Sequence, residues 1–123
     1  MKRLVFDLDN TLTFEGTGDY ENVQPRMDIV EKLREYHAQG FEIIINTARN
    51  MRTYNNSVGK ITANTLPIIL KWLEKHDIPY DEIHVAKPWC GNDGFYIDDK
   101  AIRPSELRDL SYEQIQQLLA KEK

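Results

Sequence analysis

Four acidic residues form two pairs, each placed directly after a short apolar run. Asp7 and Asp9 follow the apolar residues 4–6, and the adjacent Asp98 and Asp99 follow the apolar residues 95–97. Alternate residues of a strand point the same way, so Asp7 and Asp9 can project together from the carboxyl end of a strand. Crowded carboxylates need a cation, and Mg²⁺ prefers carboxylate oxygens and water. If the two strands are neighbours, the sequence predicts a magnesium site; the alternative is that each pair caps a loop or helix.

Two further polar residues follow the other apolar runs. Thr47 comes after the Ile-rich residues 41–45, and Lys87 comes after residues 83–85. A hydroxyl and a backbone N–H at a strand end can bind phosphate oxygens, and a lysine can neutralise developing charge. Taken singly, such residues more often occupy a loop or a solvated surface. Their position after successive strands predicts a phosphoryl-transfer site.

Strands must alternate with helices to bring these residues to one edge of a sheet. Residues 13–24 and 46–56 are polar and predict loops, the first of them an exposed flap. Alternation of this kind predicts an α/β fold with a mostly parallel sheet. The predicted strands are residues 2–8, 41–45, 83–85 and 95–97, and the predicted helices run from Pro25 to Gly40, from Thr65 as a cap to His76, and from a Ser111–Gln114 capping box onward.

Composition restricts the function classes. The chain has 123 residues, which predicts one domain over residues 1–123, and a net charge of -4 that gives no support for nucleic-acid or anionic-membrane binding. Asp7 and Asp9 interrupt the first apolar run, so no signal peptide or membrane segment is expected. The sequence contains one cysteine, Cys90. We expect a cytoplasmic protein without disulfides.

In the order of its polar residues the chain resembles the haloacid-dehalogenase (HAD) superfamily of phosphohydrolases. The first motif of that family, Asp-x-Asp-x-Thr on the first strand, is followed by a Ser or Thr, a Lys and an acidic pair, each after a later strand. The matching residues are Asp7, Asp9, Thr11, Thr47, Lys87, Asp98 and Asp99. The resemblance covers nearly the whole chain and implies a three-layer Rossmann-like (HAD-like) fold.

The resemblance also implies the chemistry. Asp7 is the expected nucleophile, which carries a transient aspartyl phosphate, and Asp9 is the expected general acid and base. Mg²⁺ is expected on the Asp7 carboxylate, the Asp9 backbone carbonyl and the acids Asp98 and Asp99. The residues expected to hold substrate are Asn10, Thr11, Thr47, Ala48, Arg49, Arg52 and Lys87.

No segment is long enough to form a cap domain. Residues 13–24 form too short a segment, and residues 50–79 are mostly occupied by a helix. An open site serves a bulky substrate or is closed by a neighbouring subunit, so we expect a homo-oligomer. Residues 49–53 and 87–91 resemble small bacterial proteins of capsule and surface-polysaccharide biosynthesis, which implies a small substrate, a phosphorylated sugar or a related polyol. The alternatives are a phosphatase of a polynucleotide end or phosphoprotein, and a non-catalytic phospho-ligand module or receiver-like signalling domain.

Overall fold

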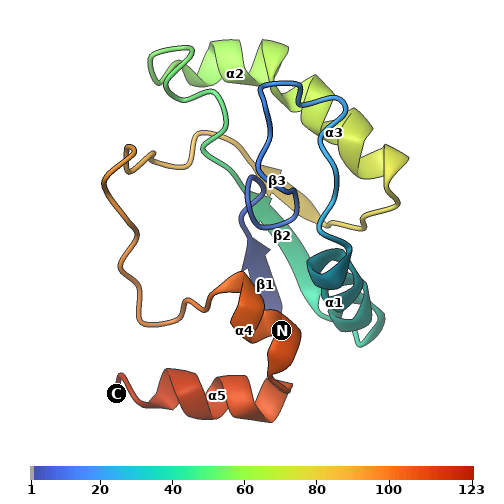
Figure 1. Cartoon of the computed structure of the whole chain (residues 1–123), viewed down its shortest axis with the longest axis vertical. Coiled ribbons are helices and arrows are strands. Elements are labelled where there is room, and N and C mark those ends of the chain that lie inside the picture. The colour runs from blue at the N-terminus through green and yellow to red at the C-terminus, as the bar shows by residue number, and fades with distance from the viewer. Residues whose placement is uncertain (1) are drawn as a thin grey trace. The chain divides into compact units, whose positions relative to one another are not determined.

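The computed structural model describes residues 2–123. These residues divide into two units that we describe separately, the first ending at Trp89 and the second spanning Cys90–Lys123 (Figure 1). The prediction of a single domain stays a prediction. No helix in the described part of the chain is long and apolar enough to cross a lipid bilayer.

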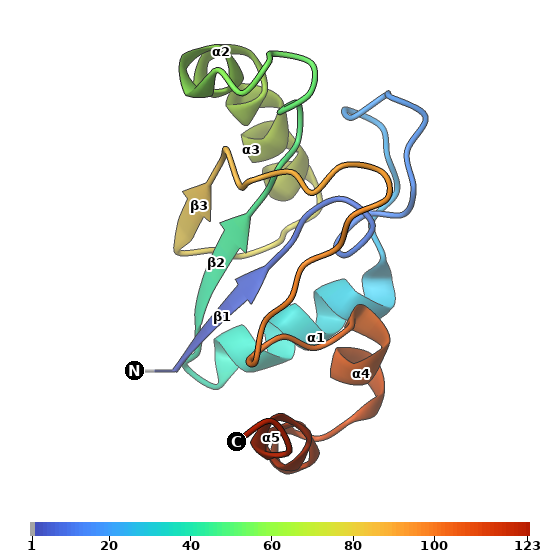
Figure 2. The same ribbon diagram turned by 90° about the vertical axis from the view of Figure 1, so that its left-hand side faces the viewer.

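The first unit contains a parallel sheet of three strands in the order β1-β2-β3. The strands are β1 (Arg3–Phe6), β2 (Glu42–Asn46) and β3 (Glu82–His84), and they run side by side in Figure 2. Three consecutive β-branched isoleucines favour β2, whose two neighbours bury it. The first three predicted strands are therefore confirmed, with ends that shift by one or two residues.

Helices cover one face of this sheet. Helix α1 (Met27–Ala38) connects β1 to β2, and helices α2 (Val58–Asn64) and α3 (Leu66–Lys75) connect β2 to β3. The strand order β1-β2-β3 means that both crossovers move to the next strand on the same side. Right-handed connections therefore place their helices on the same face of the sheet. Phe6 points to that face and is buried with the β2 residues Ile43 and Ile45. The opposite face carries Arg3 and Val5 of β1, which are exposed.

Two details of the crossover helices differ from the sequence prediction. The sequence does not predict helix α2, because Ile61 is its one buried side chain and a single apolar residue gives no helical period. The Ser57 hydroxyl caps this helix by accepting a hydrogen bond from the Lys60 N–H. Thr65 does not cap α3 through its side chain. Its hydroxyl donates instead to the side chain of Asn50, at 2.7 Å.

The second unit contains two helices, α4 (Pro104–Asp109) and α5 (Tyr112–Ala120). The predicted capping box of Ser111 and Gln114 at α5 is confirmed, whereas α4, with six residues, is too short to show a period. The predicted strand over residues 95–97 is wrong, because these residues are assigned to no strand and their side chains are exposed. A strand exists only when a neighbour accepts its backbone hydrogen bonds, and no such neighbour is present in the part of the chain that the structure describes. The α/β class and the parallel sheet are confirmed, and the three-layer HAD-like arrangement stays a prediction.

Candidate active site

A tight turn directly after β1 positions the first acidic pair. The carbonyl oxygen of Leu8 accepts hydrogen bonds from the N–H groups of Thr11, Leu12 and Thr13, at 3.2, 2.9 and 3.1 Å. Asn10 has a φ of 62°, a left-handed conformation that asparagine tolerates better than most residues. Leu8 is fully buried and anchors the turn. The turn uses the Leu8 carbonyl and leaves the neighbouring Asp9 carbonyl outside its hydrogen bonds.

The Asp7 carboxylate lies next to a hydroxyl and an ammonium group. The Thr11 hydroxyl donates to Asp7 Oδ2 at 3.4 Å, and the Lys87 Nζ is 3.8 Å from Asp7 Oδ1. Burial raises the pKa of Asp7 and the charge of Asp9 raises it further, whereas Lys87, the Leu8 N–H and the Thr11 hydroxyl lower it. The net pKa shift is upward, so the folded chain favours a proton or another positive charge at Asp7.

This shift predicts how stability depends on pH. A carboxyl whose pKa is higher in the folded state costs stability once pH rises above its ordinary value of 3.8 and through the folded value. We therefore expect Asp7→Asn to melt at a higher temperature than the parent near pH 7, with the gap closing toward pH 3. Thermal melts in a metal chelator measure this difference. A gap that is constant with pH would contradict the prediction.

Thr47 and Lys87 come together because hydrogen bonds continue beyond the ends of β2 and β3. The Thr47 N–H donates to the His84 carbonyl at 2.9 Å, and the Lys87 N–H donates to the Thr47 carbonyl at 3.0 Å. Ala86 has a φ of 66°, a left-handed conformation that costs energy in an alanine. This strained residue directly precedes Lys87 and turns its side chain toward Asp7.

Arg49 binds the second acid of the first pair. Its Nε lies 3.2 Å from each carboxylate oxygen of Asp9, and its Nη2 lies 2.6 Å from Oδ1. Arg49 is 4% exposed, and its guanidinium carbon lies 4.1 Å from the centre of the Tyr20 ring. The Nη1 atom is buried without a hydrogen-bond partner in the described structure. Arg49 thus fixes Asp9 and retains one donor for a further acceptor.

These contacts form a chain that connects the ends of all three strands. Asp7 contacts Lys87, Lys87 bonds to Thr47, the Thr47 Oγ1 accepts from the Arg49 N–H at 3.1 Å, and Arg49 binds Asp9. The Thr47 hydroxyl retains its own proton for donation. Six of the predicted residues therefore lie together: Asp7, Asp9, Thr11, Thr47, Arg49 and Lys87. The Arg49–Asp9 pair and the Tyr20 stack were not predicted, although Arg49 follows the strand that neighbours β1 and so could have suggested a partner there.

The remaining candidates occupy other positions. Asn10 and Arg52 are exposed and Ala48 is half-buried. Asp98 and Asp99 belong to the second unit, where both are exposed and the Asp98 carboxylate accepts from the Lys100 N–H at 2.8 Å. In neither unit, among the described residues, do three or more His, Cys, Asp or Glu side chains form a metal-binding cluster.

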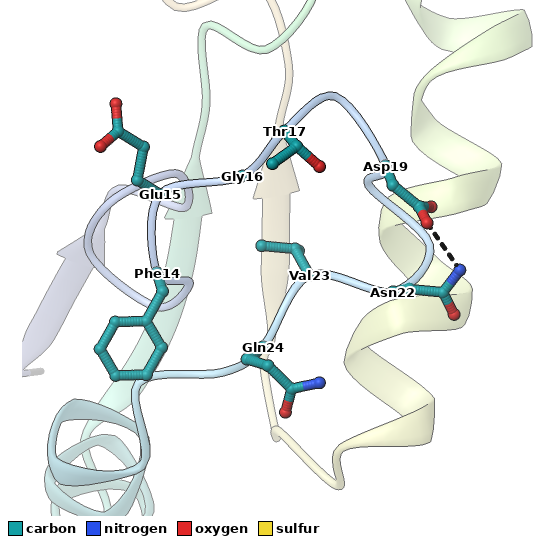
Figure 3. Close-up of a pocket in the computed structure, with 8 residues that line it drawn as sticks. All are labelled: Phe14, Glu15, Gly16, Thr17, Asp19, Asn22, Val23 and Gln24. Atoms are coloured by element: carbon teal, nitrogen blue, oxygen red, sulfur yellow. Dashed lines mark hydrogen bonds between the residues drawn. The ribbon is translucent and has the colours of Figure 1, made fainter.

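The flap over residues 14–24 borders an open hollow of about 370 Å³ (Figure 3). This loop alone lines it, and the Asn22 amide donates to Asp19 within the loop at 2.9 Å. The Trp72 indole N–H donates to the Val23 carbonyl at 2.8 Å and ties the flap to α3. The anchored flap carries Tyr20 onto Arg49, whereas neither Asp7 nor Asp9 lines its hollow.

No protein-family model matches the chain, and no curated protein does. Two chains from structures of the Pnkp1/Rnl/Hen1 complex and the Pnkp1/Rnl/Hen1 RNA repair complex share its fold, at 20% and 17% identity and a TM-score of 0.53 for each. These matches cover 89% and 99% of this chain, which spans about a third of those chains, 34% and 32%.

A third match covers both chains completely. It is the crystal structure of an MCSG target from Vibrio cholerae, with 64% sequence identity, a TM-score of 0.98 and 100% coverage of each chain. Identity at this level over the full length of both chains shows common ancestry and a common fold, so the protein belongs to the same family as this Vibrio cholerae protein.

Proposed function

We propose that the protein is a phosphatase that transfers a phosphoryl group from a phosphomonoester to Asp7 and then to water. The contacts around Asp7 support this proposal more than any other observation. The Asp7 carboxylate lies 3.8 Å from the Lys87 ammonium, the Lys87 N–H donates to the Thr47 carbonyl, and the Thr47 hydroxyl oxygen accepts from the Arg49 N–H. A non-catalytic module has no need for this combination of an acid, a cation and a hydroxyl.

The residues of the site fit a bound Mg²⁺. Burial raises the pKa of Asp7, so a cation beside this carboxylate would favour its charged form, and the Asp9 carbonyl is not used by its own turn. These two groups, with Asp98 and Asp99, would supply the oxygen ligands that Mg²⁺ prefers. When bound, the ion would neutralise charge on the phosphoryl oxygens and on Asp7.

The protein groups would act in two steps. In the first, an Asp7 oxygen attacks phosphorus, the bond from phosphorus to the leaving oxygen breaks, and Asp9 gives that oxygen a proton. In the second, Asp9 takes a proton from water, whose oxygen attacks phosphorus and releases phosphate from Asp7. Lys87 and Thr47 would hold the transferred group.

For the substrate, we infer that a phosphorylated polynucleotide end should be tested first. The fold is shared with chains of an RNA repair complex, and a site without a cap domain admits a bulky substrate. The net charge of -4 opposes this choice. A sugar phosphate is therefore the comparison in the assay.

Hydrolysis should require a divalent ion. We expect phosphate release from a panel of 3′- and 5′-phosphorylated oligonucleotides and sugar phosphates with Mg²⁺, with activity reduced at least about 100-fold by a chelator and restored by added Mg²⁺. The same panel ranks the two substrate classes. Activity that is unchanged by chelation would contradict the magnesium site, and no hydrolysis of any ester would contradict the phosphatase.

A further inference from the structure

In the part of the chain that the structure describes, one edge of β1 has no strand beside it. Among the described strands β1 pairs with β2 alone, and its Val5 is 63% exposed. Strands of parallel sheets are normally buried on both faces. An edge that presents unpaired backbone groups and an apolar side chain is a template for another strand.

The chain also contains a segment that has the composition of a strand without being one. Phe95 is 75% exposed and Ile97 is 89% exposed, the largest exposures among the large apolar residues of the described chain. Aromatic and β-branched residues favour strands. Asp98 and Asp99 follow this segment directly, so any strand formed by residues 95–97 determines where these acids lie.

The direction that such a strand must take follows from the proposed function, and this part of the inference rests on that function. The acids reach Asp7 only if residues 95–97 run parallel to β1, because Asp7 lies at the carboxyl end of β1. The Lys87 N–H is already bound at that end, to the Thr47 carbonyl. A chain that pairs with its own β1 must therefore return to the amino end of the sheet between Lys87 and Phe95.

The connection is too short for this return within one chain. A parallel crossover takes about a dozen residues or more and usually includes a helix, whereas residues 88–94 are seven in number and contain no helix. Gly94 shortens the path further, because it lies so close to the Cys90 carbonyl oxygen that a Cβ there would overlap it. A second copy of the chain has no such constraint.

We propose that residues 95–99 of a second copy add a parallel strand to the open edge of β1 and bring their Asp98 and Asp99 to the Asp7 site. The exchange is reciprocal, as two-fold symmetry requires. Each active site is then composed of two chains. This arrangement accounts for the exposed edge, for the exposed apolar segment and for a first unit that holds too few acids for a metal.

Complementation between two inactive variants tests the shared site. Asp7→Asn and the double variant Asp98→Asn/Asp99→Asn are co-expressed with different affinity tags, and the doubly tagged heterodimer is purified. In a reciprocal exchange one of its two sites is fully wild-type, so we expect about half of the wild-type activity. No activity in the heterodimer, with an active wild-type protein, would overturn the shared site.

A cross-linking experiment tests the strand exchange without any activity. In a Cys90→Ser background, a tagged Val5→Cys chain and an untagged Tyr96→Cys chain are mixed and treated with a short bismaleimide. We expect a covalent dimer containing one chain of each kind, and an Asp19→Cys chain in place of Val5→Cys serves as the negative control. A Val5→Cys/Tyr96→Cys chain that closes on itself as a monomer would overturn the exchange. An inactive wild-type protein that still gives the mixed dimer would refute the phosphatase and retain the exchange.

Discussion

Asp7→Asn is expected to lower the rate of phosphate ester hydrolysis by about 10⁴-fold or more while the protein remains folded. The amide cannot attack phosphorus, and no other carboxylate takes its place because Arg49 holds Asp9. Steady-state hydrolysis with Mg²⁺ measures the rate. The circular dichroism spectrum and the thermal melt show that the fold is intact.

Asp19→Asn is the matched control for this change. Asp19 lies in the flap, where it is exposed and accepts a hydrogen bond from the Asn22 amide. We expect its loss to leave the rate within about twofold of wild type, as for most surface substitutions. Full activity in Asp7→Asn would show that Asp7 is not the nucleophile, whatever the activities of the other variants.

The sequence predicted the elements whose pattern is local. The predicted runs 4–6, 41–45 and 83–85 are mostly apolar or β-branched and bounded by polar residues, and each overlaps a strand of the sheet. The polar residue after each run then lies at the carboxyl end of the sheet by geometry alone. This is why the first-unit residues of the site could be predicted from their order in the chain.

Features that depend on a partner could not be predicted in the same way. The composition of residues 95–97 favours a strand, but only a neighbouring strand makes one. Helices α2 and α4 are short and owe their ends to caps and to Pro104 rather than to an apolar period. The Arg49–Asp9 pair joins residues 40 positions apart, and its energy comes from burial that the sequence does not reveal.

Asp9→Asn is expected to lose activity and, unlike Asp7→Asn, also to lose stability. The Asp9 side chain is 36% exposed, but the Arg49 side chain that it neutralises is 1% exposed. Removal of one partner of a buried ion pair costs about 3–5 kcal/mol, so we expect about 2 kcal/mol for this partly exposed pair. Urea denaturation in a chelator measures the loss.

Asp109→Asn provides the matched control, because Arg108 and Asp109 form an ion pair in which both side chains are exposed, at 2.7 Å. A surface pair of this kind contributes between about zero and 1 kcal/mol, so this variant should denature close to wild type. An Asp9→Asn protein as stable as wild type would mean that Arg49 does not depend on Asp9. Asp7→Asn and Asp9→Asn are expected to change stability in opposite directions, although both lose activity. That result would show that the Asp7 carboxylate needs a further cation, whereas the Asp9 carboxylate already has one in Arg49.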